Sequence, residues 1–330
     1  MSLHAVDNVE AAFDATRSFL TPFERGTWAR LALVALFVGG GVGLPTAQFN
    51  ASAPADVPVG DLPVNPPVDL VTLVVAVVAV GLVLAAGFAL IGAVMEFVLV
   101  ESLREGVVSV RRYWSRHWRR GLRLFGFRVA IGLPFLTLVV GWVAALVLPL
   151  AASGRPGIPV AAFVALAPVV FVGGLLYGVV AAFTTAFVVP IMIRADVGVL
   201  AAWRRLWGSV ASAWKEYLAY AVVAFLLTAA TGVVAAVAVG IVAVALLVPA
   251  LVAAGVAYLT LTLSSAVGVA VVVGVAAAYA LAVLCVSLVV RVPVVTFLRY
   301  YALLVLGDVE PAFDVLDGGP NGADGDSAAA

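Results

Sequence analysis

Long apolar runs separated by short polar or proline-rich connections make up most of the chain from about residue 27 onward. An α-helix needs about 17–25 consecutive apolar residues to cross the hydrocarbon core of a bilayer. Six runs meet this requirement, and they lie at residues 27–44, 70–99, 122–152, 160–193, 217–248 and 265–290. The pattern therefore predicts an all-α, polytopic helical membrane bundle of about six transmembrane helices.

The connections between the runs contain helix breakers. Residues 46–68 carry five prolines, which preclude a helix there and predict a loop. Residues 153–159 form a second cluster of breakers, and Pro168 and Pro190 are expected to kink the span at 160–193. Residues 249–264 are apolar, and we expect a short outer connection there; a seventh span is the alternative.

The distribution of positive charge favours six spans. With both termini in the cytoplasm, seventeen of the 18 Lys and Arg residues fall on or near the cytoplasmic side, and only Arg155 lies outside. This asymmetry is the positive-inside pattern of multi-pass proteins. We therefore predict a cell-membrane protein with both termini cytoplasmic.

Two basic connections predict amphipathic helices. At 100° per residue, one apolar stripe within about 80° is formed by Leu200, Trp203, Trp207, Val210 and Trp214, and it excludes Arg204 and Arg205. A similar stripe contains Leu103, Val107, Val110, Trp114, Trp118 and Phe125, opposite Arg112, Arg116, Arg119 and Arg123. Such helices lie in the membrane interface and bind lipid phosphates; a regulated docking surface for lipid or protein is the alternative. We expect Asp196 to be the N-cap of the helix that carries the first stripe.

A weaker amphipathic pattern opens the chain. Its apolar side contains Val6, Val9, Phe13 and Leu20, and its polar side contains Asp7, Asp14 and Ser18. The Thr21-Pro22 pair is expected to end this helix.

The basic connections also align with each other. Phe97 matches Phe187 and Arg104 matches Arg194 at an offset of 90, whereas three pairs match at an offset of 89: Trp114 with Trp203, Arg116 with Arg205, and Trp118 with Trp207. This alignment predicts three parallel repeats at 5–99, 101–193 and 195–306, each an interfacial helix followed by two spans. They would form one membrane domain over residues 1–316, followed by a disordered acidic tail at 317–330.

Composition excludes several classes of protein. The chain is 65% hydrophobic and only 11% charged, far from the balance of a soluble domain. Its formal net charge of zero excludes nucleic-acid binding by bulk charge. A single Cys and two His predict no disulfide and no metal site, and the chain contains no HExxH, GxSxG or Walker-type motif. We expect no catalytic residue, no cofactor and no enzymatic activity.

Two charged residues are expected inside the spans at similar depth. Glu96 lies about one turn before the cytoplasmic end of its span, and Arg128 lies about two turns into the next span from the same side. Because unpaired charges are costly in a bilayer, we predict that the two form a structural ion pair. A transport or proton-relay site is the alternative.

Three segments, at residues 97–106, 121–128 and 297–308, resemble a family of uncharacterised multipass proteins from haloarchaea, and residues 2–49 fit that family too. The bias of 17 Arg to one Lys suits such a genome. More distantly, the Trp/Arg connections are similar to the membrane domain fused to some glycerophosphodiester phosphodiesterases. The chain lacks the catalytic domain of those enzymes, so the resemblance implies a fold and a location and no hydrolase activity.

These features favour a non-enzymatic accessory or structural membrane component that contacts membrane lipids. A transporter or lipid-handling permease is the alternative, supported by the repeat and by Pro134, Pro168 and Pro190 within the spans. A membrane enzyme acting on lipids is a third hypothesis. The sequence leaves protein partners and homo-oligomerisation open.

Overall fold

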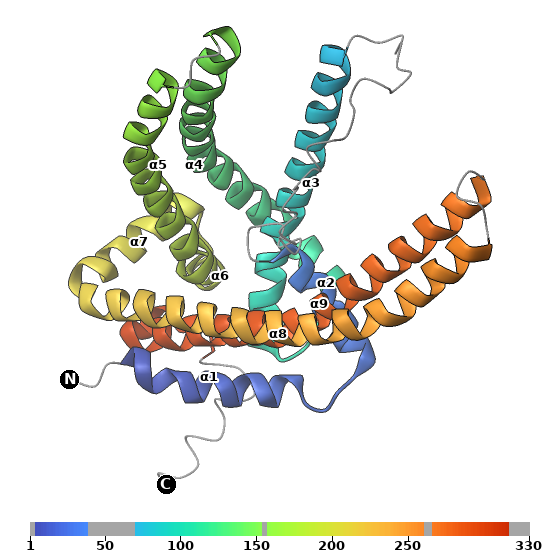
Figure 1. Ribbon diagram of the computed structural model, residues 1–330. Coiled ribbons are helices and arrows are strands. Elements are labelled where there is room, and N and C mark those ends of the chain that lie inside the picture. Colours follow the sequence, from blue (N-terminus) through green and yellow to red (C-terminus); the bar gives the residue numbers. More distant parts are fainter. Residues whose placement is uncertain (1–3, 39–69, 154–156, 261–265, 317–330) are drawn as a thin grey trace. The chain divides into compact units, whose positions relative to one another are not determined.

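The computed structural model describes residues 4–38, 70–153, 157–260 and 266–316, and within these ranges the regular structure is helical, with no strand (Figure 1). The first half contains α1 (His4–Leu20), α2 (Arg25–Phe37), α3 (Leu70–Glu105) and α4 (Val110–Ser153). The second half contains α5 (Gly157–Phe183), a π-helix (Thr184–Val188), α6 (Val189–Ala195), α7 (Val199–Ser212), α8 (Trp214–Thr260), α9 (Ala266–Val309) and a 3-10 turn (Pro311–Phe313). The all-α prediction is confirmed.

Five segments of the described chain are long and apolar enough to cross a membrane: Ala79–Glu105, Val110–Leu148, Val160–Ala195, Trp214–Ala257 and Val267–Val309. They coincide with the second to sixth predicted spans. The structure describes the first predicted span, 27–44, only as far as residue 38. This described part of the span belongs to α2, which ends at Phe37. The rest of that span, the loop at 46–68, Arg155 and the tail at 317–330 lie outside the described residues.

The helices of the last two spans, α8 and α9, are longer than the predicted spans at 217–248 and 265–290. Residues 249–260 continue α8, and Pro249 lies inside that helix. The prediction of an outer connection over 249–264 is therefore wrong for residues 249–260. The alternative, a separate seventh span in this segment, is also wrong. With 47 residues at 1.5 Å per residue, α8 is about 70 Å long, more than twice the thickness of the hydrocarbon core.

The chain divides into two compact units, which we describe separately. The first comprises residues 1–39, 101–110 and 209–330, and the second comprises 40–100 and 111–208. These boundaries do not follow the three predicted repeats, since α3 and α7 each contribute to both units.

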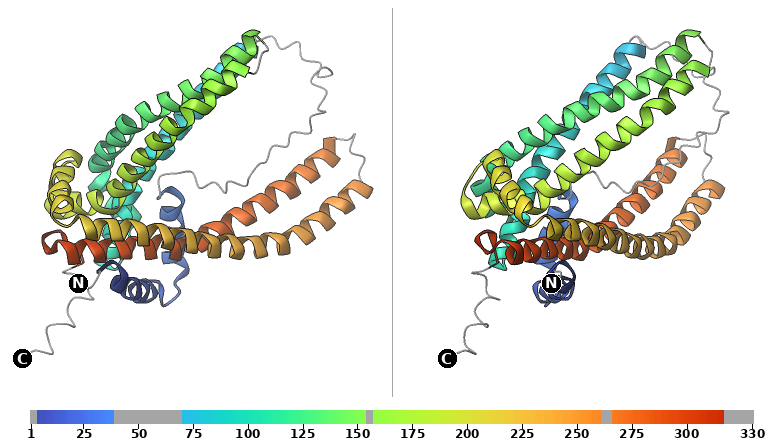
Figure 2. Two further views of the ribbon diagram at one scale, coloured as in Figure 1. Left: turned by 60° about the vertical axis from the view of Figure 1, so that its left-hand side comes forward. Right: turned by 90° about the vertical axis from the view of Figure 1, so that its left-hand side faces the viewer.

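In the first unit, α8 and α9 form a long antiparallel hairpin, and α1 lies along α9 (Figures 1 and 2). Tyr220 stacks on Tyr301 across the hairpin, with ring centroids 5.5 Å apart. Arg291 of α9 donates a hydrogen bond to the carbonyl of Val38, at the end of α2, over 2.9 Å. The carbonyl groups at the end of a helix have no partner within that helix, and the Arg291 guanidinium supplies the hydrogen bond for the carbonyl of Val38.

The buried face of α1 differs from the predicted one. Between residues 8 and 20, where the side chains of α1 are described, the buried residues are Asn8, Ala12, Thr16 and Leu20, spaced four apart, whereas Phe13 is 58% exposed. The face of α1 that packs on the protein therefore shares Leu20 with the predicted apolar stripe but not Phe13, and the interfacial role of that stripe stays a prediction. Small and polar residues allow α1 to approach α9 closely, and the Asn8 side-chain amide donates to the Asp308 carboxylate over 2.6 Å.

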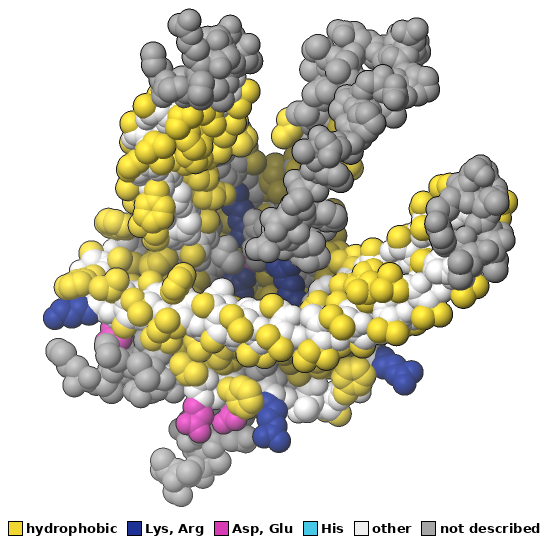
Figure 3. All heavy atoms as spheres, viewed as in Figure 1, with side chains coloured by type: hydrophobic (Ala, Val, Ile, Leu, Met, Phe, Trp, Pro, Cys, Tyr) yellow, Lys and Arg dark blue, Asp and Glu magenta, His cyan; other side chains and the backbone are white. Residues whose placement is uncertain are grey.

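In the second unit, glycines and stacked aromatic rings bring α4 and α5 together. A Cβ on Gly173 would lie 2.9 Å from Leu138 Cδ2, so α4 and α5 meet closely at this glycine. Phe135 and Tyr177 stack with centroids 5.0 Å apart. Hydrophobic side chains cover much of the outer surface of the long helices (Figure 3), as lipid contact requires.

Two helix ends in this structure support a local repeat. Gly106 follows α3 with φ 66° and Asp196 follows α6 with φ 50°, and the two positions differ by the same offset of 90 that relates Arg104 to Arg194. The next helix begins at Val110 in one case and at Val199 in the other. Residues 111–119 and 200–208 also have the same pattern of buried, half-buried and exposed positions. The full set of three repeats stays a prediction.

The same helix ends correct two local predictions. Asp196 is the left-handed residue after α6 and not the N-cap of α7, which begins at Val199. The stripe predicted from Leu103 to Phe125 does not lie on one helix, because the chain turns at Gly106. Periodicity carries no information about this break, although a glycine is the usual residue at a left-handed helix end.

Candidate functional site

The structure brings the predicted charged pair, Glu96 and Arg128, together. Glu96 lies on α3 with its side chain 0% exposed, and its Oε1 is 3.3 Å from Nη2 of Arg128 on α4. The same Arg128 nitrogen donates to the hydroxyl of Thr185 over 2.8 Å. Three segments of the second unit therefore meet at one guanidinium group: α3, α4 and the π-helix. We call Glu96, Arg128 and Thr185 the charged triad.

A close crossing of α3 and α4 fixes the spacing of this triad. A Cβ on Gly121 would lie 2.4 Å from Cγ2 and 2.9 Å from Cα of Val94. No side chain fits in this space, so glycine is required for the two backbones to approach so closely. Val94 lies two residues before Glu96, and Arg128 lies two helical turns after Gly121 on the same helix face.

The π-helix that carries Thr185 has a local cause. Pro190 has no amide hydrogen, so it cannot donate to the carbonyl one turn earlier. The helix widens just before it, and the amide of Val189 donates to the carbonyl of Thr184, five residues back. The Thr184 hydroxyl in turn donates to the carbonyl of Val180 over 2.6 Å. Such π-helical turns inside α-helices are frequent at functional sites.

A second polar cluster lies closer to the start of α4 and was not predicted. The ring of His117 is buried and stacks on Phe97, with centroids 5.9 Å apart. Arg120 lies 3.1 Å from Nδ1 of His117, and it also forms an ion pair with Asp196. The sequence indicates Arg120 only as one of the cytoplasmic charges, Asp196 as a helix cap, and His117 as one of two histidines. The signal for the cluster was the spacing of three residues between His117 and Arg120 on one helix face.

The tryptophan stripe on α7 is largely exposed. Leu200 is 69% exposed and Trp207 is 66% exposed, and Trp203 is half-buried beside Phe127, with ring centroids 6.5 Å apart. The buried face of α7 consists instead of Val199, Ala202, Leu206 and Ser209. Arg204 and Arg205 are exposed. We call Leu200, Trp203, Trp207, Arg204 and Arg205 the α7 face.

Trp214 does not belong to this helix, because α7 ends at Ser212 and Trp214 begins α8 in the first unit. It is exposed, and the Lys215 ammonium lies 5.8 Å from its ring centroid. The predicted five-residue stripe is therefore wrong as a single helical face.

The first turns of α4 show the same arrangement as α7. Tyr113, His117, Gly121 and Leu124 are buried, Trp118 is about half-exposed and Trp114 is half-buried. The exposed arginines of this segment are Arg111, Arg112, Arg116, Arg119 and Arg123, and the Arg119 guanidinium lies 5.9 Å from the Trp118 ring centroid. These turns continue into the span without a break, so no separate interfacial helix precedes α4.

No group of three or more His, Cys, Asp or Glu residues within the described part of the chain could hold a metal ion. Residues 3–316 match the model of a family of unknown function, DUF7544. The chain belongs to this family. No curated protein and no solved structure matches the chain. The DUF7544 match covers every described residue from 4 to 316, so both compact units, the charged triad and the α7 face belong to one family.

Proposed function

We propose that this multi-pass membrane protein is a non-enzymatic accessory or structural component of the cell membrane, attached on its cytoplasmic side to anionic lipid. The observation that carries the proposal is the α7 face, in which an exposed Trp207 is flanked by the exposed cations Arg204 and Arg205. Tryptophan is favoured where a bilayer changes from apolar to polar, and arginine binds lipid phosphate.

The charged triad fits this proposal as a structural clamp. Glu96 and Arg128 lie at ion-pair distance, and Thr185 accepts a further hydrogen bond from Arg128. A pair of this kind neutralises both charges at a depth where little water can solvate them. It also links three helices in the half of the membrane nearer the cytoplasmic side of the predicted topology.

A transporter or lipid-handling permease is the second candidate. It is favoured by the π-helix beside the charged triad, because helix irregularities and buried charges in a membrane often mark substrate pathways. Density for a lipid or a solute between the spans of the purified protein would support this candidate over the accessory role. A polar cavity with two or more carboxylates would instead support an enzyme acting on lipids.

The haloarchaeal resemblance and the more distant likeness to a phosphodiesterase membrane domain are consistent with a membrane location. Neither assigns a substrate, and a phosphodiesterase activity is not part of the proposal. The expected partners are membrane lipids. We propose no nucleic-acid partner, and protein partners and oligomeric state are open to experiment.

The lipid attachment predicts a specific change in tryptophan quenching. The wild type and the W207S variant are reconstituted in vesicles of anionic phospholipid brominated near the headgroup end of the acyl chains. Bromines at this depth should quench a smaller fraction of the tryptophan emission in W207S than in the wild type. The reason is that Trp207 would lie at the boundary between headgroups and chains. Steady-state fluorescence of the two proteins measures the difference.

The matched control is W142S. The Trp142 indole donates to the Phe163 carbonyl over 2.8 Å and stacks on the Phe163 ring, so it belongs to the packing of α4 and α5. Its replacement should leave the quenching by shallow bromines unchanged. An unchanged fraction in W207S as well would mean that the α7 face does not lie on lipid, and the proposed attachment would be wrong. A second variant, R204Q/R205Q, should reduce the quenching only when the vesicles are anionic.

A further inference from the structure

The first unit contains a pocket of about 730 Å³ that none of the features above uses. Its walls come from the end of α1, the beginning of α2, the end of α3 with the segment that follows it, α9 and the chain after the 3-10 turn. A volume of this size is within the range of pockets that bind small molecules.

Two arginines line the pocket, Arg30 of α2 and Arg104 of α3. Arg30 donates from Nη1 to the carbonyl of Val108 over 3.2 Å, which anchors one edge of its guanidinium group to the pocket wall. Arg104 is 3.9 Å from Glu101, and its side chain is 37% exposed. A guanidinium group has five N–H donors, so a single contact leaves most of them for a ligand.

Aromatic and aliphatic side chains form one part of the remaining wall. Phe19 packs edge-on against Tyr300, with ring centroids 6.1 Å apart, and the Tyr300 hydroxyl donates to the Leu103 carbonyl over 3.4 Å. Val107 and Leu304 add aliphatic surface. Phe19 also packs against a core cluster of Leu20, Leu31, Ala35, Val108 and Val292, of which Val108 lines the pocket too.

Two carboxylates also line the pocket, and each is engaged within its own turn. Glu24 accepts a hydrogen bond from the Thr27 hydroxyl over 3.1 Å, and Asp314 accepts one from the amide of Leu316 over 2.8 Å. Among the residues that the structure describes, neither arginine has a carboxylate at hydrogen-bond distance, and the nearest approach is the 3.9 Å between Glu101 and Arg104. They are the side chains best placed to meet an anion.

Aromatic residues next to the pocket indicate its depth. Phe23 is exposed and packs against Trp28 with ring centroids 5.0 Å apart, at the start of the helix that begins the first predicted span. The Trp28 indole donates to the Leu20 carbonyl over 3.4 Å. Aromatic side chains of this kind collect where a spanning helix enters the membrane, which is also the level of lipid phosphates.

We propose that this pocket binds the phosphate of an amphiphile, with Arg30 and Arg104 on the phosphate and the aliphatic wall against the adjoining chain. Guanidinium groups match phosphate geometry with paired hydrogen bonds, and a phospholipid headgroup supplies both the charge and the apolar neighbour. This site goes beyond the proposed function, because it lies in the other unit from the α7 face and needs none of its residues.

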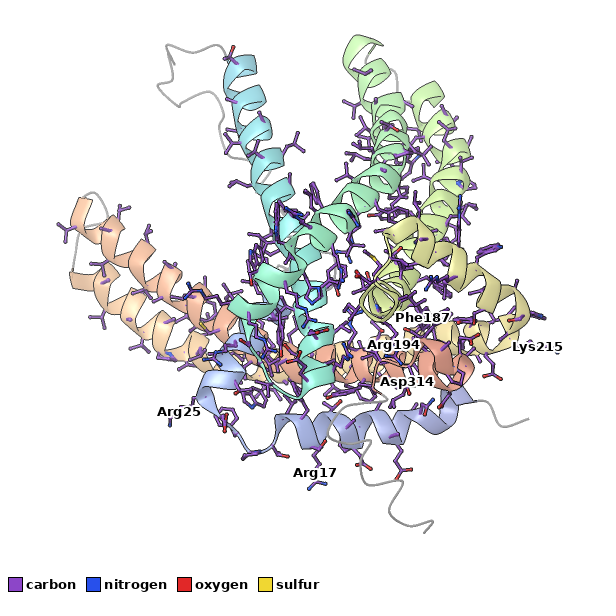
Figure 4. All side chains as sticks on the ribbon, turned by 180° about the vertical axis from the view of Figure 1, so that it is seen from behind. Arg17, Arg25, Phe187, Arg194, Lys215 and Asp314 are labelled. Atoms are coloured by element: carbon purple, nitrogen blue, oxygen red, sulfur yellow. The ribbon has the colours of Figure 1, made fainter. Side chains whose placement is uncertain are left out.

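Binding of short-chain phosphatidylglycerol to the detergent-purified full chain tests the proposal. We expect R30Q/R104Q to weaken binding about tenfold or more, since the charged hydrogen bonds from both guanidinium groups to the phosphate are lost. The matched control is R17Q, because Arg17 projects from α1 on the side away from α8 and α9 (Figure 4) and does not line the pocket. It should bind the lipid as the wild type does. Microscale thermophoresis gives the dissociation constants.

Two further probes distinguish the sources of the phosphate. Short-chain diacylglycerol, which has no phosphate, should not bind, and inorganic phosphate should compete with the lipid only weakly. Competition by phosphate at a similar dissociation constant, with the same dependence on the arginines, would assign the site to a soluble phosphate compound. Equal lipid affinity in R30Q/R104Q and R17Q would overturn the proposal. If R30Q/R104Q does not fold, R30K/R104K keeps the charge and should show an intermediate loss.

Discussion

The E96Q variant is expected to lower the free energy of unfolding by about 2–4 kcal/mol, because it leaves the Arg128 guanidinium without its counter-charge in a buried site. Glu96 is fully buried. The glutamine carbonyl of the variant can still accept a hydrogen bond from Arg128, as the Thr185 hydroxyl does, but neither group carries a charge that balances the guanidinium. Steric-trapping measurements in detergent micelles or bicelles give the change in free energy.

A double-mutant cycle separates the pair from the individual side chains. E96Q/R128Q should recover part of the loss, with a coupling energy on the order of 1–3 kcal/mol. R123Q is the control, because Arg123 is an exposed residue of the same helix, and it should change stability by less than about 0.5 kcal/mol. Strictly additive effects of E96Q and R128Q would contradict the structural clamp, and the transporter candidate would gain support.

Substitution of Gly121 is expected to have an effect of similar size for a different reason. Even an alanine Cβ would lie 2.9 Å from the Val94 Cα, so one helix has to move away from the other. We expect G121A to cost about 1–3 kcal/mol and G121V to cost more, as overpacking of a close contact does. The increase in the helix separation should also lengthen the contact between Glu96 and Arg128.

Gly126 provides the matched control for this prediction. It lies on the same helix, it is exposed, and a Cβ there would meet nothing within 4 Å. G126A should therefore be neutral or slightly stabilising, since alanine has the higher helix propensity. Equal stability of G121A and G126A would show that α3 and α4 do not cross closely at Gly121.

The sequence predicted the helical class and the centres of five spans because the bilayer requires long apolar runs. It did not predict the helix ends. Hydropathy treats the arginine-rich turns before residue 122 as a connection, yet Tyr113 and His117 are buried and α4 begins at Val110. Similarly, the apolar pattern predicts a span that ends at residue 248, whereas α8 continues through Pro249 to Thr260. Tertiary packing of Tyr113 and His117 explains the first case.

The charged pair was predictable from depth alone, since Glu96 and Arg128 lie at similar distances from one side of the membrane on adjacent spans. Thr185 was not predictable, because its place beside Arg128 depends on the π-helix before Pro190. Periodicity located Trp203 and Trp207 on one face correctly, but it carried no information about the break before Trp214.

Accessibility of single cysteines to a membrane-impermeant maleimide tests the central claim, which is a multi-pass protein with its basic connections and both termini in the cytoplasm. Cys285 is first replaced by Ala, and one cysteine is then introduced at Ser52, Ser212 or Ser327. In intact cells, S52C should be labelled, whereas S212C and S327C should be labelled only after the membrane is permeabilised. Labelling of S327C and S52C from the same side of the membrane would contradict the six-span topology, and labelling of S212C in intact cells would contradict the cytoplasmic position of α7.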